Sequence, residues 1–158
     1  MSVFPWALWG FVGTVVLSTL AATSQGLGLT RMNMPLMLGT MFTPNRDRAK
    51  VYGLGVHLLN GWVFALLYIG TFHLLGRATF WIGGVIGFVH ALFVLTVGMR
   101  VFPGMHPRMA SEQHGPSVAR QLEPPGFLAL NYGVRTPLAV VISHIVFGMI
   151  LGGFYPLH

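Results

Sequence analysis

Residues 78–99 read ATFWIGGVIGFVHALFVLTVGM and contain no Asp, Glu, Lys or Arg. A helix needs about 20 mostly apolar residues to cross the hydrocarbon core of a bilayer, and this segment is long enough. Three other charge-free segments are also long enough, at residues 2–30, 51–76 and 136–158. Because hydrocarbon offers peptide groups no hydrogen-bonding partner, segments that span it must be helical. The sequence therefore predicts an all-α integral membrane protein with four transmembrane helices.

The composition leaves room for one membrane domain and for no soluble catalytic domain beside it. The chain has 158 residues, of which 54% are hydrophobic and 8% are charged. Such a balance is typical of a membrane protein whose loops are short relative to its spans. We expect a single four-helix membrane domain over residues 1–158, with spans at about 4–26, 51–75, 79–100 and 137–155 and loops at 30–50 and 101–136.

The basic residues predict an orientation. Eight of the nine Lys and Arg residues follow the first span or lie between the third and fourth spans, and the ninth, Arg77, lies in the tight turn between the second and third. Loops rich in Lys and Arg remain on the cytoplasmic side of a membrane. We therefore expect the two long loops in the cytoplasm, and the N-terminus, the Arg77 turn and the C-terminus outside.

The charge and the residue types exclude several classes of function. The net charge of +6 comes from residues near the ends of apolar spans, where anionic lipid headgroups lie, so the expected partner is the lipid bilayer and not nucleic acid. The chain has no cysteine, which excludes disulfides and thiolate ligands. It also has no GxSxG or HExxH motif and no phosphate-binding glycine loop. We therefore expect no enzyme activity.

Glycine pairs predict where helices approach closely. The third span has Gly83 and Gly87, and the fourth has Gly148 and Gly152, each pair four residues apart. Small residues at this spacing let two membrane helices pack with their backbones close together. We expect the third and fourth spans to pack through these faces, or one of the faces to contact a partner chain.

An internal repeat suggests a duplicated hairpin. The second span carries His57, Gly61 and Tyr68, and the fourth carries His, Gly and Tyr at the same spacing, at residues 144, 148 and 155. These positions lie within about 40° of one another around a helix, so each set forms one stripe, and Gly61 joins the predicted packing residues. The repeat suggests two tandem helical hairpins related by an axis along the membrane normal.

Three histidines lie at membrane depth and are the main candidates for chemistry. His57, His90 and His144 could bind a cofactor such as haem, a chlorin magnesium, or a copper or zinc ion, with His106 as a further ligand beside His57 and His144. Alternatively, each imidazole donates a hydrogen bond to a neighbouring helix and fixes the packing. A third interpretation is a proton or substrate path. The residue types leave these alternatives open.

The loop at residues 101–136 is long for so small a protein, and long loops are often functional. Five prolines and four glycines between Val101 and Pro137 predict a defined series of turns. We expect this loop to form a docking surface for a protein partner or a plug over the cytoplasmic mouth of the bundle, with contacts from Arg108, Glu112, Glu123, Phe127 and Tyr132.

Four short segments carry a resemblance to a family. HLLNG at residues 57–61, HPRM at 106–109, LEPPGF at 122–127 and NYG at 131–133 resemble a group of small, functionally uncharacterised, multi-pass bacterial inner-membrane proteins. The resemblance covers most of the chain from Leu38 onward. It implies a location in the bacterial plasma membrane and implies no activity or ligand.

These observations support three hypotheses about function. The leading one is a non-catalytic integral membrane subunit or accessory protein of a larger bacterial membrane complex. The second is a haem-, chlorin- or metal-binding membrane protein that uses the intramembrane histidines. The third is a small oligomeric channel or transporter, in which homo-oligomerisation completes a polar path lined by the histidines and by Thr19, Thr23, Gln25 and Asn60.

Overall fold

The computed structural model describes residues 2–157, and 71% of the chain is helical, with no strands among those residues. Four helices are long and apolar enough to span a membrane: α1 at Val3–Gly26, α3 at Arg46–Leu75, a continuous helix at Phe80–Met105, and α6 at Thr136–Phe154. The third comprises α4 (Phe80–Phe93), a π-helical turn (Val94–Gly98) and α5 (Met99–Met105). The shorter helical segments are α2 (Met34–Gly39) and a 3₁₀ helix (Phe127–Tyr132). The predicted all-α fold with four candidate spans is confirmed.

Two helices extend beyond the predicted spans. The α3 helix begins at Arg46 and not at residue 51, because the Asn45 side chain caps it by accepting from the backbone N–H groups of Asp47 (3.1 Å) and Arg48 (3.0 Å). The third spanning helix continues to Met105, five residues past the predicted end. Hydropathy marks only the apolar part of a helix, so it misses charged turns at either end.

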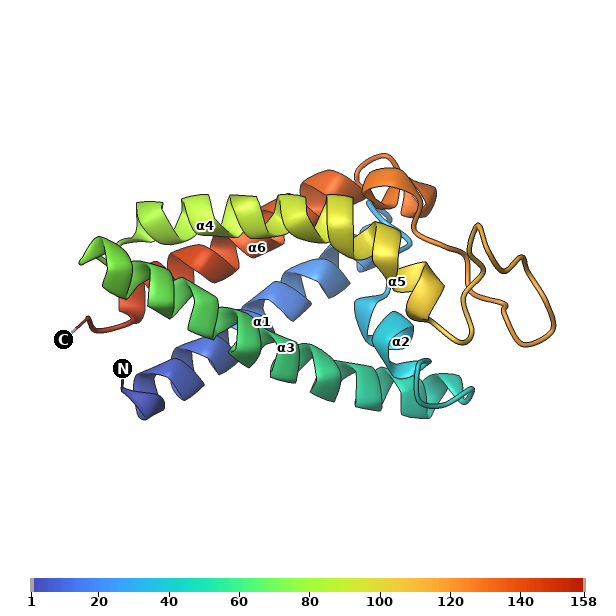
Figure 1. The fold of residues 1–158 in the computed structure, drawn as a ribbon, viewed down its shortest axis with the longest axis horizontal. Helices are drawn as coiled ribbons and strands as arrows, with labels where there is room; N and C mark the ends of the chain where they lie inside the picture. Colours follow the sequence, from blue (N-terminus) through green and yellow to red (C-terminus); the bar gives the residue numbers. More distant parts are fainter. Residues whose placement is uncertain (1, 158) are drawn as a thin grey trace.

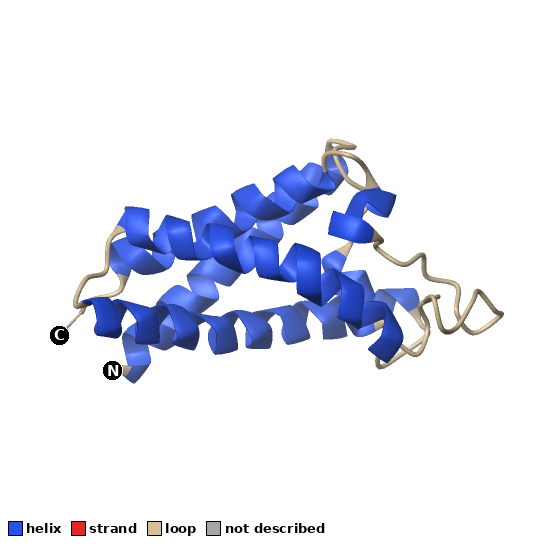
Figure 2. Cartoon of the chain, turned by 45° about the horizontal axis from the view of Figure 1, so that its top comes forward, coloured by secondary structure: helices blue, strands red, loops and turns tan. Residues whose placement is uncertain are grey.

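The four long helices share two common ends (Figures 1 and 2). The start of α1, the end of α6 and the turn at residues 76–79 lie at one end, which we call the turn end. The long loop at residues 106–135 and the start of α3 lie at the opposite end, which we call the loop end. The α3 and α4 helices meet at the turn end and diverge towards the loop end, where α2 lies beside α3 (Figure 1).

The helix pair with the most extensive contact is α4 with α6. A Cβ added to Gly83 would collide with the carbonyl of Gly148, and one added to Gly87 would collide with the carbonyl of His144. A Cβ on Gly152 would collide with the Thr79 carbonyl in the same way. The two glycine pairs therefore lie against each other within one chain, where only a missing side chain lets the backbones approach.

A second close approach joins α3 to α1. A Cβ on Gly61 would collide with the Thr14 side chain, so the glycine of the first repeat contacts the helix that precedes it. Gly148, its counterpart in the second repeat, likewise contacts the preceding long helix. Each long helix that carries the repeat thus packs on its predecessor through the same repeat position.

The α2 helix packs tightly across the first part of α3. A Cβ on Gly39 would collide with the Ala49 carbonyl, and a Cβ on Gly53 would collide with the Pro35 carbonyl. Pro35 lies in the first turn of α2, where its missing N–H costs nothing, and Asn33 caps this helix by accepting from the Leu36 N–H at 2.9 Å. The α2 helix is thereby fixed in the interior of the loop end.

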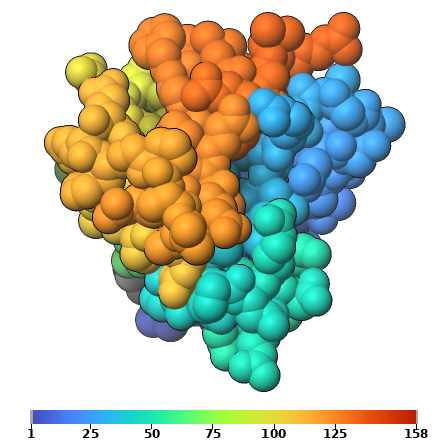
Figure 3. All heavy atoms as spheres, turned by 90° about the vertical axis from the view of Figure 1, so that its right-hand side faces the viewer, coloured from blue at the N-terminus to red at the C-terminus, as the bar shows by residue number. Residues whose placement is uncertain are grey.

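The loop at residues 106–135 is folded back onto the bundle. Met109 pairs with Leu122 in an isolated bridge, and the buried Tyr132 donates its hydroxyl hydrogen bond to the Glu123 carbonyl at 2.5 Å. Arg31 forms an ion pair with Glu123 at 3.2 Å and ties the loop to the end of the first span. Figure 3 views the loop end, where the loop covers one side and the segments from the end of α1 to the start of α3 form the other.

Candidate functional site

A cavity of about 240 Å³ lies inside the bundle. All four long helices and α2 contribute to it, and most of its surface is apolar, formed by Met, Phe, Leu and Val side chains. No Asp, Glu, Lys or Arg occurs among the lining residues in the described part of the chain. The notable polar groups are three imidazoles, those of His57, His90 and His144. The structure therefore brings the three intramembrane histidines to one cavity.

Each of the three imidazoles is held by a hydrogen bond at its Nδ1 atom. His57 Nδ1 lies 3.1 Å from the Ser18 hydroxyl, and His90 Nδ1 lies 3.0 Å from the Tyr68 hydroxyl. His144 Nδ1 lies 2.8 Å from the carbonyl of Val140, one turn earlier in α6. Anchoring at Nδ1 fixes the ring orientation and leaves the Nε2 atom free for another partner.

The hydrogen bonds assign the tautomers of two rings. A carbonyl can only accept, so His144 Nδ1 carries the proton and its Nε2 carries a lone pair. The Ser18 hydroxyl donates its single proton to the Thr14 carbonyl at 2.7 Å, so it must accept from His57 Nδ1. His57 Nε2 therefore also carries a lone pair. The two histidines of the repeat thus present the same acceptor atom.

His90 presents a hydrogen-bond donor at Nε2, whereas His57 and His144 present an acceptor there. The buried Tyr68 hydroxyl has the His90 Nδ1 atom as its partner, and a phenol that donates there leaves the proton on His90 Nε2. The His90 and His144 rings are perpendicular with centroids 4.8 Å apart, and the Phe64 ring lies 4.1 Å from the His90 ring. A hydrogen-bond donor and an acceptor therefore lie next to each other in the cavity wall.

The Nε2 atoms face accessible space. Within residues 2–157, every buried side-chain nitrogen or oxygen that is sealed from solvent has a hydrogen-bond partner. The three Nε2 atoms have no hydrogen-bond partner in the described chain, so each keeps some accessible surface, and all three residues line the cavity. An unpaired imidazole nitrogen in an apolar setting costs free energy, which a bound ligand would recover.

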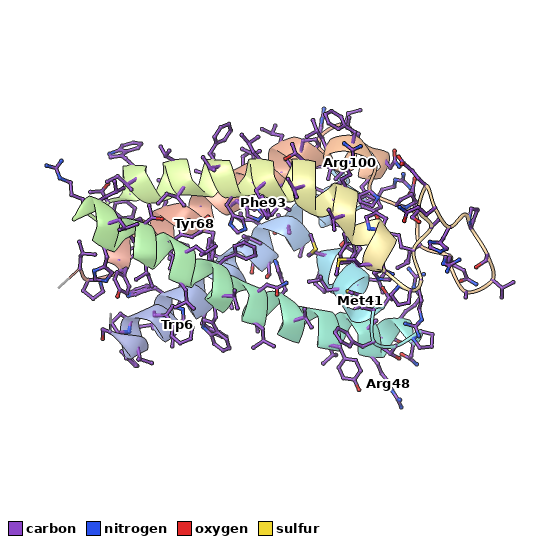
Figure 4. The ribbon with its side chains drawn as sticks, viewed as in Figure 1. Trp6, Met41, Arg48, Tyr68, Phe93 and Arg100 are labelled. Carbon is purple, nitrogen blue, oxygen red and sulfur yellow. The ribbon has the colours of Figure 1, made fainter. Side chains whose placement is uncertain are left out.

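Some residues of the cavity wall are exposed at the surface of α3 and of the third spanning helix. The wall includes Asn60 and Phe64 from α3 and Phe93 and Val94 from the third span, and both Asn60 and Phe93 are exposed at the surface. Tyr68 and Phe93 are labelled between these two helices in Figure 4. A surface halfway along apolar helices faces lipid in a membrane. These exposed wall residues are therefore placed to contact the bilayer.

A π-helical turn forms part of the cavity wall. Val94 and Gly98, the first and last residues of this turn, both line the cavity, and His90 lies one turn before it. Single π-helical turns insert one extra residue into an α-helix and occur often at functional sites. The irregular backbone therefore coincides with the candidate site.

No protein-family model matches the chain, and no curated protein and no solved structure matches it significantly. The case for a function rests on the geometry of the cavity.

The structure separates His106 from the other predicted metal ligands. Its Nε2 lies 2.9 Å from the Met37 carbonyl, and its Nδ1 accepts from the Arg108 backbone N–H at 3.0 Å. Both ring nitrogens are therefore occupied at the loop end, away from His57 and His144. Among residues 2–157, no group of three or more His, Cys, Asp or Glu residues is placed to hold a metal ion.

The His90 and His144 rings leave no room for a macrocycle between them. Axial ligands on opposite faces of a macrocycle must leave room for the flat ring between them. These two rings contact each other directly, with centroids 4.8 Å apart. A haem between His57 and His144 involves a different pair of rings and stays a prediction. The cavity of about 240 Å³ is smaller than most ligand pockets, which span about 300–1,000 Å³.

The predicted partner-contact residues differ in exposure. Glu112, Glu123 and Phe127 are exposed on the loop. Tyr132 is instead buried, with 7% of its surface accessible, and Arg108 is half-buried because its guanidinium donates to the Thr40 carbonyl at 2.6 Å. These two side chains hold the loop to the bundle, so they are not available to a partner.

The polar residues expected to line a path also separate. Thr19 and Thr23 are exposed on the outer face of α1, and Thr19 donates to the Val15 carbonyl at 2.8 Å, as hydroxyls commonly do on lipid-facing helices. Asn60 lines the main cavity, and Gln25 lines a second, smaller cavity. Sequence reasoning missed Ser18 and the role of Tyr68, although Tyr68 stands in the repeat.

His106 predicts a pH dependence of stability. Burial lowers the pKa of His106 below its usual range; the hydrogen bond to the Met37 carbonyl opposes this, and the nearby Arg108 charge adds to it. The unfolded chain then binds a proton near pH 6.5 that the folded chain does not bind. Stability should therefore fall as the pH drops below about 6.5, by at most about 1.4 kcal/mol per pH unit from this group.

The measurement is thermal unfolding in detergent from about pH 7 to about pH 5 for the wild type and the His106→Gln variant. The variant should lose part of the wild-type decline with acidification. Parallel curves for the two proteins would show that His106 contributes nothing to the pH dependence.

Proposed function

We propose that this protein is a non-catalytic integral membrane subunit that binds a lipid-soluble ligand with hydroxyl groups, of the hydroquinone class. One observation carries the proposal: His57 and His144, whose Nε2 atoms each carry a lone pair, line the same apolar cavity. Lone pairs require a hydrogen-bond donor or a metal ion. A hydroxyl group supplies the donor without adding charge.

The lining residues favour a neutral ligand. A carboxylate or phosphate in this cavity would find no Lys or Arg among the lining residues of the described chain, and a cation would find no carboxylate. Burying an unpaired charge in such surroundings is expensive, whereas a neutral hydroxyl costs little once it is hydrogen-bonded. The apolar walls favour a hydrophobic body of about the size of one ring system.

The neighbouring rings of His90 and His144 suit one hydroxyl group. A hydroxyl can donate to the His144 Nε2 lone pair and accept from the His90 Nε2 proton at the same time. A second hydroxyl at the far side of an aromatic ring can then donate to His57 Nε2. A quinone has only acceptors, so it can satisfy His90 but neither of the other two rings.

Binding of a short-tailed hydroquinone and of its quinone tests this proposal. In lipid nanodiscs under anaerobic conditions, we expect the hydroquinone to bind roughly 10- to 100-fold more tightly than the quinone, which corresponds to one or two hydrogen bonds. The measurement is calorimetric titration with each form separately. Equal affinities, or no binding of either form, would contradict the proposal, and stoichiometric binding of cuprous ion would favour the metal alternative.

Variants localise the binding. His57→Asn and His144→Asn keep a polar atom near the Nδ1 position and remove the Nε2 atom, so each should weaken hydroquinone binding about tenfold. His73→Asn is the matched control, because His73 is exposed at the end of α3 and does not line the cavity. Equal effects at all three positions would show that the hydroquinone does not bind at His57 and His144.

We propose a bacterial plasma membrane location, with the loop end in the cytoplasm. The loop end holds Arg46, Arg48 and Lys50 before the second span and the arginines of the long loop, which matches the positive-inside rule. Figure 4 draws Arg48 extending away from the body of the molecule at this end. The matching contacts of Gly61 and Gly148 support two tandem hairpins. The N-terminus and C-terminus would then lie outside.

A contact with a larger membrane complex is supported by apolar side chains on the loop. Val118, Phe127 and Val134 are exposed to 92%, 75% and 85% of their surface. Exposed apolar side chains on one end of a small protein are suited to contact a partner or the membrane interface. We propose that the loop is where such a complex docks, as a second role beside ligand binding.

A further inference from the structure

A second, smaller cavity lies beside the main one, between α1, α2 and α3. Its volume is about 70 Å³, which gives room for several water molecules. Its lining differs from that of the main cavity because it is rich in polar groups, with Ser18, Gln25, Asn33 and His57 among them. We call it the vestibule. A polar cavity of this size is the kind that holds water.

Residues of the wall between the two cavities line both of them. They are Ala21, Met32, Met34 and His57. His57 is the member of this wall that can carry a proton, and it lines both cavities. Its Nδ1 bonds to Ser18, which lines the vestibule and not the main cavity, so we assign its Nε2 to the ligand in the main cavity.

The vestibule lies on the side of the loop end. Gln25 is the second-last residue of α1, and Asn33 caps α2 and donates from its amide to the Gln25 side chain at 3.2 Å. Ser18 lies eight residues before Gly26, the end of α1, which is about 12 Å deeper along the helix. The polar side chains of Gln25, Asn33 and Ser18 thus lie between the end of α1 and His57.

We propose that the vestibule is an aqueous route from the loop end to His57, through which His57 exchanges protons with water. This deepens the proposed function, on which its ligand-related part rests: the ligand hydroxyl gives a proton to His57 Nε2, and Nδ1–H gives its proton to water beside Ser18. The ligand oxygen keeps the electron pair of the broken O–H bond as an anion until the reverse transfer returns a proton from water through His57, which restores the neutral ligand. One proton enters and one leaves the ring, so no oxidant or reductant is needed for this exchange.

His57 faces other groups from every element packed around it. Ser18 approaches from α1, and the other two cavity histidines, His90 and His144, come from α4 and α6. No lining residue of either cavity carries a permanent charge within residues 2–157. His57 is therefore the group that joins the ligand cavity to the polar vestibule.

The absence of cysteine makes this route directly testable. In single-cysteine variants, a membrane-impermeant thiol reagent modifies only a thiol that reaches water, because the reactive species is the thiolate. Ser18→Cys faces the vestibule, and Thr19→Cys lies at the same depth on the exposed outer face of α1. We expect the reagent to modify Ser18→Cys at least tenfold faster than Thr19→Cys in nanodiscs.

Sidedness and a second variant complete the experiment. In sealed vesicles, Ser18→Cys should react from the same side as Gln121→Cys, a position exposed on the long loop. Ala21→Cys lines both cavities, so it should react with the reagent and be protected by bound hydroquinone. If Ser18→Cys and Ala21→Cys are both as unreactive as Thr19→Cys, the vestibule is closed to water and the inference is overturned.

Deuterium exchange at the imidazole carbon between the two nitrogens tests the proton step. This exchange proceeds through the protonated ring, so it requires a supply of protons from water. The intact protein is incubated in heavy water, then digested, and the peptides are analysed by mass spectrometry. We expect His57 to exchange several-fold faster than His144 in the same sample. Equal rates at the two rings would overturn the assignment of His57 as the proton-exchanging group.

The outcomes separate this inference from the proposed function. Thiol modification and ring exchange need no ligand, so both can succeed when the hydroquinone does not bind, and the proposed function alone then fails. Hydroquinone binding with an unreactive Ser18→Cys and a slowly exchanging His57 would instead remove the route and leave the binding site.

Discussion

Gly148→Ala is expected to destabilise the folded protein by about 3 kcal/mol, because the added methyl group meets the backbone of α4 and no flexible side chain. A Cβ at this position would collide with the carbonyl oxygen of Gly83, and its other neighbours include the Tyr68 ring. Neither helix can relieve the collision by rotating a side chain. The α4 and α6 helices must therefore separate, and their contact is the most extensive between any two helices of the described chain. The measurement is the midpoint of thermal unfolding in detergent.

Gly70→Ala is the matched control for this variant. Gly70 also lies within a spanning helix, but it is exposed and has no atom within 4 Å of an added Cβ. Alanine has the higher helix propensity, so the control should be neutral or stabilising by up to about 1 kcal/mol. If Gly148→Ala unfolds at the same temperature as Gly70→Ala, the close approach of α4 and α6 does not determine stability.

Arg108→Met should release the long loop from α2 at a cost of about 2 kcal/mol. The guanidinium donates to the Thr40 carbonyl at 2.6 Å and to the Met41 carbonyl at 3.4 Å, just after the end of α2. Hydrogen bonds from charged donors contribute about 1.5–3 kcal/mol, and the C-terminus of a helix attracts positive charge. Methionine keeps most of the aliphatic length and removes only the charged group. The loop should then be cleaved faster by added protease.

Arg100→Met controls for the loss of one positive charge. Arg100 is exposed, and Figure 4 draws it on the outer side of the bundle, so its replacement should change stability by at most about 0.5 kcal/mol. Equal protease sensitivity of the two variants would indicate that Arg108 acts only through the net charge.

The four spans were predictable because their physical cause is local. A charge-free segment of spanning length has one stable conformation in hydrocarbon, and residues 80–99 illustrate this directly. The end of the same helix at Met105 was not predictable from hydropathy, because Arg100 ends the charge-free segment and Pro103, a residue type that usually breaks a helix, lies inside the helix. The cap at Asn45 is also local, yet it lies outside the apolar segment.

The candidate site was predictable only in part. Spacing placed His57 and His144 on equivalent stripes of two helices, but convergence on one cavity depends on the order of the helices around the bundle, which no single span encodes. The hydrogen bond from His57 to Ser18 joins residues 39 positions apart. His106 looked like a further ligand because it is a histidine in a distinctive motif. Only its two hydrogen bonds reveal a structural role in holding α2.

The π-helical turn at Val94–Gly98 gives the third span an evolutionary signature. One surplus residue rotates everything after it by about 100° relative to an unbroken α-helix, and Met99 faces the cavity in this rotated phase. A relative that lacks the surplus residue would align with a single gap between His90 and Met99, and the side chains that follow the gap would turn away from the cavity. Such a gap would separate chains that kept the site from chains that lost it, even where all three histidines remain.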